Sequence, residues 1–89
     1  YSILKMGENW LVGTIYEGLK LITKSGAVLR SFSTHDGLLS NTIHELSKDS
    51  LGKIWIKTPN GINYIDSTRG LHIYTTMLHD KRYHAFQDA

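Results

Sequence analysis

The stretch from Asp36 to Ile65 reads DGLLSNTIHELSKDSLGKIWIKTPNGINYI, and it decides the fold class. It holds three segments rich in β-branched, aliphatic and aromatic residues, at 43–47, 53–58 and 62–65. The first two are separated by Asp-Ser-Leu-Gly and the last two by Pro-Asn-Gly, sequences that favour tight turns because Pro fixes φ and Asn-Gly tolerates positive φ. The stretch therefore predicts three antiparallel strands joined by two tight turns.

Parts of this stretch recur toward the N-terminus. The recurring positions, with their separations in residues, are Gly7 and Gly52 (45), Trp10 and Trp55 (45), Thr14 and Thr58 (44), Gly18 and Gly61 (43), and Gly26 and Gly70 (44). One extra residue between Trp10 and Thr14 indicates either a β-bulge or that Leu11, not Trp10, occupies the position of Trp55. A β unit with a period in the forties is typical of a propeller, because a four-stranded blade takes about 40 to 50 residues.

Further strands are expected at 1–5, 10–14, 19–22, 28–32, 71–74 and 83–86, and no segment has a convincing helical pattern. The 89 residues include no cysteine, so disulfides and thiolate metal sites are excluded. The net charge is +2 with scattered basic residues, which disfavours nucleic-acid binding. No apolar run approaches the roughly 20 residues of a membrane span, and the start at Tyr1 suggests a piece of a longer chain.

Residues 52–62, preceded by the Asp36-Gly37-Leu38-Leu39-Ser40-Asn41 segment and by Asp49-Ser50, resemble the two-component regulator propeller repeat. That family shows Asp-Gly-Leu-x-Ser-Asn, an inner strand, Asp-x-x-Gly, then aliphatic-Trp-Ile-Gly-Thr and a Gly-Leu strand. Three positions depart from the pattern: Lys57 replaces Gly, Ile62 replaces Leu, and Leu4 stands where the first unit is expected to have an acid matching Asp49.

The resemblance implies an all-β fold: a β-propeller fragment of about two four-stranded antiparallel blades plus the first strand of a third. By that scheme residues 1–32 form one blade, 33–41 an inter-blade loop, 42–75 a second blade, and 76–89 a loop and the inner strand of the next blade. The whole protein would be a periplasmic sensor of a hybrid histidine kinase, a homodimer anchored by membrane segments outside this chain, and often concerned with carbohydrates. Neighbouring blades of the same chain are the expected partners.

In such a propeller, ligands are expected at the loops that join the second and third strands and the successive blades. The residues predicted to bind a ligand there are Tyr16, Glu17, His35, Asn41, Asn60, His79, Lys81 and Arg82. Aromatic, amide and basic groups suit an oligosaccharide, whose hydroxyls and carboxylates need directional partners. Structural roles in turns and packing are predicted for the repeat positions Gly7, Trp10, Thr14, Gly18, Asp49, Gly52, Trp55, Thr58 and Gly61.

Other chemistries find less support in the sequence. Trp10 and Trp55 could stack on sugars, but a Trp in a repeated blade strand more often packs between blades. His44-Glu45-Leu46 resembles a kinase phosphoacceptor box, yet it lies in a strand context without the following Pro. No metal, cofactor or catalytic motif is expected, so this segment is predicted not to be an enzyme. A carbohydrate-active propeller enzyme, a lyase or hydrolase, and a non-catalytic interaction scaffold are the alternatives for the whole protein.

The isolated 89-residue segment is predicted to be poorly stable or to associate through its edges, because two blades cannot close a ring. A chain of this size also buries only about 60 to 65% of the surface that its unfolded form exposes. Thermal unfolding at several concentrations, followed by circular dichroism, tests this. A sharp transition of a monomer, independent of concentration, contradicts the prediction.

Overall fold

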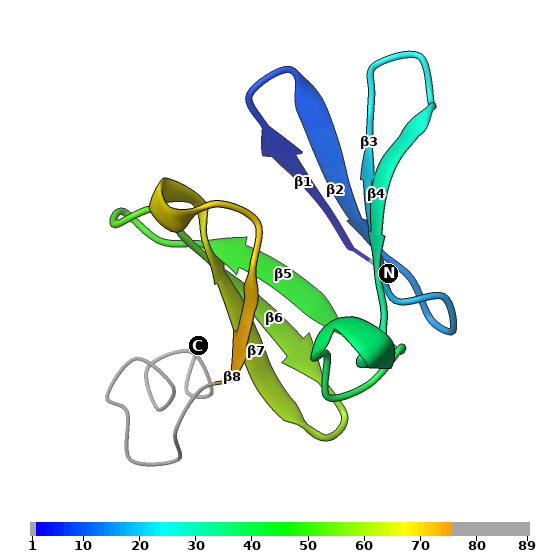
Figure 1. Cartoon of the computed structure of the whole chain (residues 1–89), viewed down its shortest axis with the longest axis vertical. Coiled ribbons are helices and arrows are strands. Elements are labelled where there is room, and N and C mark those ends of the chain that lie inside the picture. Colours follow the sequence, from blue (N-terminus) through cyan, green and yellow to red (C-terminus); the bar gives the residue numbers. More distant parts are fainter. Residues whose placement is uncertain (1, 76–89) are drawn as a thin grey trace.

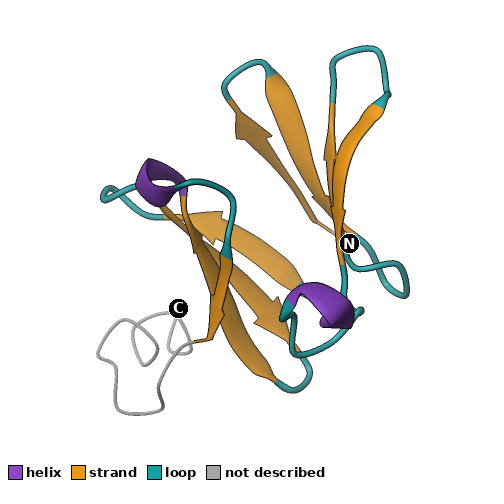
Figure 2. Ribbon diagram, in the orientation of Figure 1, coloured by secondary structure: helices purple, strands orange, loops and turns teal. Residues whose placement is uncertain are grey.

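The computed structural model describes residues 2–75, which form two four-stranded antiparallel sheets (Figures 1 and 2). In each sheet the strands lie side by side in chain order, β1-β2-β3-β4 and β5-β6-β7-β8, as in a propeller blade. The predicted all-β fold with two four-stranded antiparallel blades is therefore confirmed. The predicted strand at 83–86, the start of a third blade, lies outside the described residues.

The first sheet consists of β1 Ser2–Met6, β2 Asn9–Gly13, β3 Leu19–Ile22 and β4 Val28–Phe32, and the second of β5 Glu45–Lys48, β6 Lys53–Thr58, β7 Gly61–Asp66 and β8 Ile73–Thr75. Two short 3-10 turns, η1 Thr34–Asp36 and η2 Ser67–Arg69, were not predicted. The strand predicted to begin at Ile43 begins two residues later, because the Ile43 N–H is bonded to the Thr14 carbonyl of the first sheet at 2.7 Å. The strand predicted at 71–74 is shorter and begins at Ile73.

The two sheets are built on the same strand register. Cross-strand pairs of the first sheet have counterparts in the second. Ile3–Val12 corresponds to Leu46–Ile56, and Trp10–Ile22 corresponds to Ile54–Ile65. Leu11–Leu21 corresponds to Trp55–Tyr64, and Val12–Lys20 corresponds to Ile56–Asn63. The register thus matches Leu11 with Trp55, and Trp10 with Ile54. It supports the second of the two alternatives left by the sequence, so β2 contains no extra residue relative to β6.

Equivalent threonines close the connection between the second and third strands of each sheet. The Thr14 hydroxyl donates to the Gly18 carbonyl at 2.7 Å, and the Thr58 hydroxyl donates to the Gly61 carbonyl at 2.8 Å. Each hydroxyl also accepts a backbone N–H from within its own turn. The first connection has three residues between threonine and glycine and the second has two, so the same closure accommodates loops of different length.

The hydrophobic core lies between the two sheets. The first sheet contributes Leu11, Leu19, Leu21 and Phe32, the second contributes Leu46, Ile54, Ile56 and Ile65, and the connecting segment adds Leu38 and Ile43. The innermost strands β1 and β5 contact each other, and the Leu46 N–H lies 3.3 Å from the Ser2 hydroxyl oxygen. Strand alternation places Leu11 on the core side of the first sheet and Trp10 on its other side.

Among the glycines, Gly18 leaves the least room for a side chain. Its φ is +75°, and an added Cβ would lie 2.1 Å from the Phe32 carbonyl oxygen. The Gly18 N–H also donates to the Asn41 carbonyl at 2.8 Å, which ties the β2–β3 connection to the segment between the sheets. A residue without a side chain is required here for both the conformation and the space.

We expect Gly18→Ala to destabilise the intact protein more than Gly26→Ala does. Both glycines have positive φ, but a Cβ at Gly26, with φ of +95°, meets nothing within 4 Å. The control therefore carries only the conformational cost, about 1 to 2 kcal/mol, whereas Gly18→Ala adds a clash with backbone. Urea unfolding monitored by circular dichroism measures both. Equal losses would show that the close approach to Phe32 has no energetic weight.

Candidate functional site at the loop end

The five described residues among the eight predicted to bind a ligand lie at one end of the two sheets. We call this the loop end, formed by residues 14–18, 33–44 and 59–60, and the opposite end, formed by the remaining strand turns, the hairpin end. Tyr16, Glu17, His35, Asn41 and Asn60 belong to the loop end. His79, Lys81 and Arg82 lie outside the described residues, so their predicted role remains a prediction.

Backbone hydrogen bonds join the connecting segment to the loop of the first sheet. Besides the Gly18–Asn41 and Ile43–Thr14 bonds, the Thr42 hydroxyl donates to the Ile15 carbonyl. On the other side, the Asn60 side-chain amide donates to the Leu39 carbonyl at 3.0 Å. The connecting segment is thus held against loops of both sheets, and it fixes the geometry of the loop end.

The buried amide of Asn63 anchors this segment to the second sheet. Its side chain is 0% exposed; its Oδ1 accepts the Leu39 N–H at 2.9 Å, and its Nδ2 donates to the carbonyls of Gly37 and Tyr74, each at 3.1 Å. The sequence interpretation missed this residue. The sequence does contain an indication of its role. Asn63 stands two residues before Ile65, and strand alternation therefore places its polar amide on the same, buried side of β7.

The loop-end residues divide into those that build the loops and those that project from them. The Asn41 Oδ1 accepts the Thr34 N–H at 2.9 Å, so both asparagines, Asn41 and Asn60, already take part in loop structure. Tyr16 is 83% exposed and His35 is exposed in η1. Glu17 is paired with Lys20 at 3.9 Å. Tyr16, Glu17 and His35 are therefore exposed without closing a loop, whereas Asn60 is exposed and its amide is bonded to Leu39.

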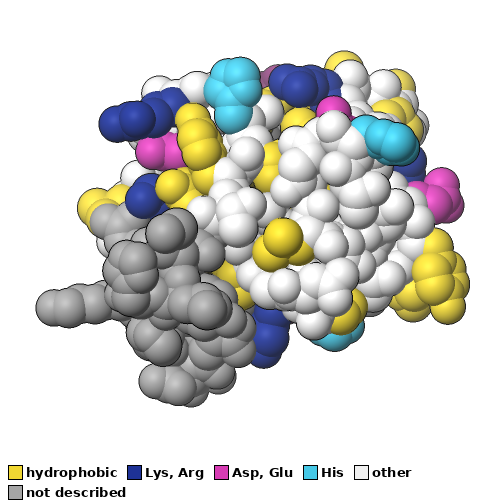
Figure 3. Space-filling view, turned by 60° about the horizontal axis from the view of Figure 1, so that its bottom comes forward, with side chains coloured by type: hydrophobic (Ala, Val, Ile, Leu, Met, Phe, Trp, Pro, Cys, Tyr) yellow, Lys and Arg dark blue, Asp and Glu magenta, His cyan; other side chains and the backbone are white. Residues whose placement is uncertain are grey.

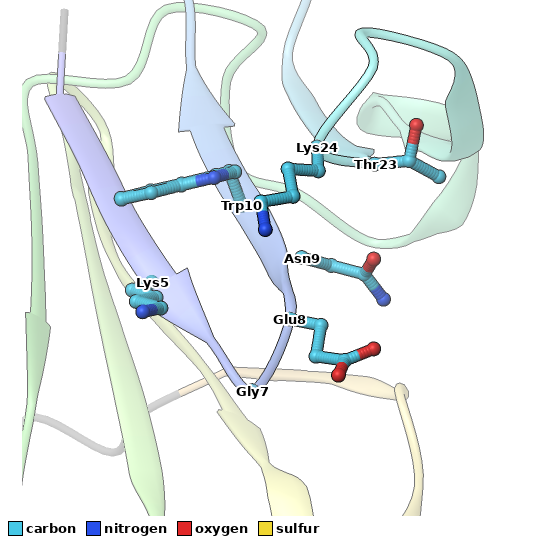
Figure 4. A pocket seen from close by; sticks show the side chains of 7 residues that line it. All are labelled: Lys5, Gly7, Glu8, Asn9, Trp10, Thr23 and Lys24. Carbon is cyan, nitrogen blue, oxygen red and sulfur yellow. The ribbon is translucent and has the colours of Figure 1, made fainter.

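Two surface hollows flank the first sheet at its opposite ends. The one at the loop end, lined by Val12, Thr14, Ile15, Tyr16 and Glu17, has a volume of about 300 Å³. The one at the hairpin end has a volume of about 450 Å³ and is lined by Lys5, Gly7, Glu8, Asn9, Trp10, Thr23 and Lys24 (Figure 4). Both volumes fall in the range of small-molecule sites, about 300 to 1,000 Å³. The sequence interpretation proposed no hairpin-end site, because its lining residues meet only through the strand register.

The two tryptophans have different surroundings. Trp55 is 4% exposed, its indole N–H donates to the Asp49 carboxylate at 3.0 Å, and its ring centroid lies 5.3 Å from that of Tyr64. Trp10 is 36% exposed and has the Lys5 ammonium 5.9 Å from its ring centroid. Asp49 also accepts the backbone N–H groups of Leu51 and Lys53, so one carboxylate shapes the β5–β6 turn and orients Trp55.

Charges are dispersed over the described surface. On the face drawn in Figure 3, basic, acidic and His side chains occupy several separate places instead of one patch. The Thr68 hydroxyl and backbone N–H donate to Asp66 and lower the pKa of that carboxyl, which caps η2 away from the loop end. Within residues 2–75 no group of three His, Asp or Glu side chains is placed to hold a metal ion. No helix of this part of the chain is long and apolar enough to cross a membrane.

Comparison with known proteins gives a structural likeness. Neither a family model nor a curated protein matches this sequence. The crystal structure of the extracellular domain of BT4673 from B. thetaiotaomicron, a protein described as a one-component system, matches with a TM-score of 0.73 and 21% sequence identity. The match covers 84% of this chain and 12% of that chain. At this identity the likeness shows the fold, and this chain corresponds to a small part of that domain.

We expect Asn63→Ala to lower the free energy of unfolding of the intact protein by about 3 kcal/mol, because each buried group left unpaired costs about 1 to 3 kcal/mol. Asn9→Ala is the matched control, since no side-chain hydrogen bond of Asn9 is found within residues 2–75, and it should change stability by less than about 0.5 kcal/mol. Urea unfolding measures both variants. Similar losses for the two would contradict the anchoring role of Asn63.

Proposed function

We propose that this chain is part of a periplasmic ligand-sensing propeller that recognises an oligosaccharide and signals to a histidine kinase. The observation that carries the proposal is the likeness of this fold, across most of the chain, to the extracellular domain of a protein described as a one-component system. The resemblance of residues 36–62 to the two-component regulator propeller repeat supports the same class of receptor.

The loop end supplies the groups that an oligosaccharide needs. Tyr16 offers an exposed aromatic ring for the apolar face of a sugar, and Glu17 and His35 offer polar groups for its hydroxyls. Asn41 and Asn60 shape the loops that carry them. His79, Lys81 and Arg82 are predicted to bind the ligand as well, and their side chains would suit an acidic sugar.

Signalling requires the ligand to bind two arrangements of the receptor with different affinity. We propose that the full-length receptor is a homodimer, that the propeller itself is not catalytic, and that the kinase lies elsewhere in the protein. A ligand at the loop end would shift the equilibrium between two arrangements of the dimer. The size of the shift is limited by the difference between the two affinities.

A glycan-binding screen on the complete extracytoplasmic region, followed by calorimetry, tests this function. Tyr16→Ala is expected to weaken binding of a captured glycan by about two- to tenfold, since an aromatic contact contributes about 0.5 to 1.5 kcal/mol and 1.4 kcal/mol is a factor of ten. Leu51→Ala, at the hairpin end and 60% exposed, is the control and should bind normally.

Three results would contradict the proposal. If the intact region binds no glycan, the carbohydrate ligand is wrong. If it cleaves a glycan, the protein is a propeller enzyme. If Tyr16→Ala and His35→Ala bind as tightly as Leu51→Ala, the loop end is not the site.

A further inference from the structure

The first sheet has a second apolar side, which faces away from the core. We call it the outer face and define it by Ile3, Trp10, Val12 and Ile22. Cross-strand pairs Ile3–Val12 and Trp10–Ile22 place these four side chains on the same side of three neighbouring strands. Ile3 is 55% exposed and Trp10 is 36% exposed. An antiparallel sheet with one side in water usually carries polar residues on that side. Here Lys5 and Lys20 lie on that side, paired with Trp10 and Val12, but the four residues of the outer face are all apolar.

The strand register identifies the counterpart of the outer face in the second sheet. Ile3–Val12 corresponds to Leu46–Ile56, and Trp10–Ile22 corresponds to Ile54–Ile65. These counterparts belong to the core between the sheets: Leu46 is 7% exposed, and Ile54, Ile56 and Ile65 are each 0% exposed. The outer face of the first sheet therefore occupies the position that, in the second sheet, another blade covers.

The side that covers the second sheet has a defined chemistry. The first sheet presents Leu11, Leu19, Leu21 and Phe32 to it, a surface of aliphatic side chains and one aromatic ring. The edge of the outer face also corresponds to the edge of the covered face of the second sheet. Lys5 is the cross-strand partner of Trp10, and Lys48 is the cross-strand partner of Ile54. Four apolar positions and one flanking lysine are thus shared by the covered face and the outer face.

We propose that the outer face is the docking surface for another propeller blade of the same polypeptide, which presents an aliphatic side like that of Leu11, Leu19, Leu21 and Phe32. Trp10 is then a packing residue between blades and not a platform for sugars. The proposal rests on the propeller part of the proposed function and not on its ligand. The structural neighbour has room for further blades, since this chain matches 12% of it.

Two other occupants fit the outer face less well. A sugar could stack on Trp10 and bond to Lys5 or Lys20, which are paired with Trp10 and Val12, but most of the outer face is formed by Ile3, Val12 and Ile22, which offer its hydroxyls no partner. In the second sheet the corresponding face is covered by the first sheet of the same chain. A blade of the same polypeptide therefore matches this arrangement better than a second copy of the chain does. With a blade in place, the hollow of Figure 4 lies at the hairpin end of the seam between two blades, with Lys5 and Lys24 among its lining residues.

The test compares glutamate substitutions in the intact protein. Ile3→Glu and Val12→Glu are expected to lower the midpoint of thermal unfolding by several degrees, because the charge would be buried against an apolar blade. Leu51→Glu is the matched control, since Leu51 is 60% exposed and lies in the β5–β6 turn of the second sheet, away from the outer face. It should unfold within about one degree of the parent.

A second measurement reports on Trp10 without disturbing the fold. The intact protein is labelled with 5-fluorotryptophan, the Trp10 and Trp55 signals are assigned with Trp10→Phe and Trp55→Phe, and a soluble paramagnetic reagent is added. A blade on the outer face should protect Trp10 as well as Trp55, which is 4% exposed. If the glutamate variants do not fold while Leu51→Glu does, protection of Trp10 still supports the proposal.

Three outcomes would overturn the proposal. The outer face is uncovered if the reagent broadens the Trp10 signal far more than the Trp55 signal and if Ile3→Glu and Val12→Glu unfold at the same temperature as the Leu51→Glu control. Protection that appears only as the protein concentration rises would assign the face to a second copy. Protection that appears only with an added glycan would assign it to a ligand. Absence of glycan binding with Trp10 protected would overturn the proposed ligand and leave the blade interface standing.

Discussion

The hydrogen-bonding demand of one buried amide determines how the two sheets are joined. An amide without contact with water must find its partners within the protein, and Asn63 finds them in the backbone of Gly37, Leu39 and Tyr74. These bonds hold the connecting segment on the second sheet, and the same segment is bonded to the β2–β3 connection of the first. The first sheet has Lys20 at the equivalent position, so this anchor belongs to the second sheet alone.

The fold class could be predicted because turns and strands are local. Glycine at positive φ and threonine before a tight connection leave clear signals, and alternation gives the strand faces. The alignment of the two units was harder, because two length changes compensate. The β1–β2 turn is one residue shorter than the β5–β6 turn, and the β2–β3 connection is one residue longer than the β6–β7 turn. Pairing identical residues therefore matches Trp10 with Trp55, whereas the strand register matches Leu11 with Trp55.

The candidate site was only partly predictable, since its contacts join segments far apart in the sequence. Polar composition marks the loop end, but it does not say whether an amide faces solvent or closes a loop. Asn41 and Asn60 close loops, with partners 7 and 21 residues away, and Tyr16 and His35 do not. The hairpin-end hollow was missed for the same reason. Trp10 and Lys24 come from different strands and connections, and only the register of β2 with β3 brings them to one surface.

A sheet that is apolar on both sides leaves its ends for recognition. Strand faces in this chain carry Leu11, Leu19 and Leu21 on one side of the first sheet and Ile3, Trp10 and Val12 on the other, so both sides favour packing over contact with water. The ends of the sheets are less constrained than their sides. The threonine and glycine that bound the connection between the second and third strands are shared by the two sheets, whereas the residues between them are not. Ile15-Tyr16-Glu17 in one sheet corresponds to Pro59-Asn60 in the other. Variation at a position that packing does not fix is where a repeated blade can acquire specificity, which favours the loop end as the place of recognition.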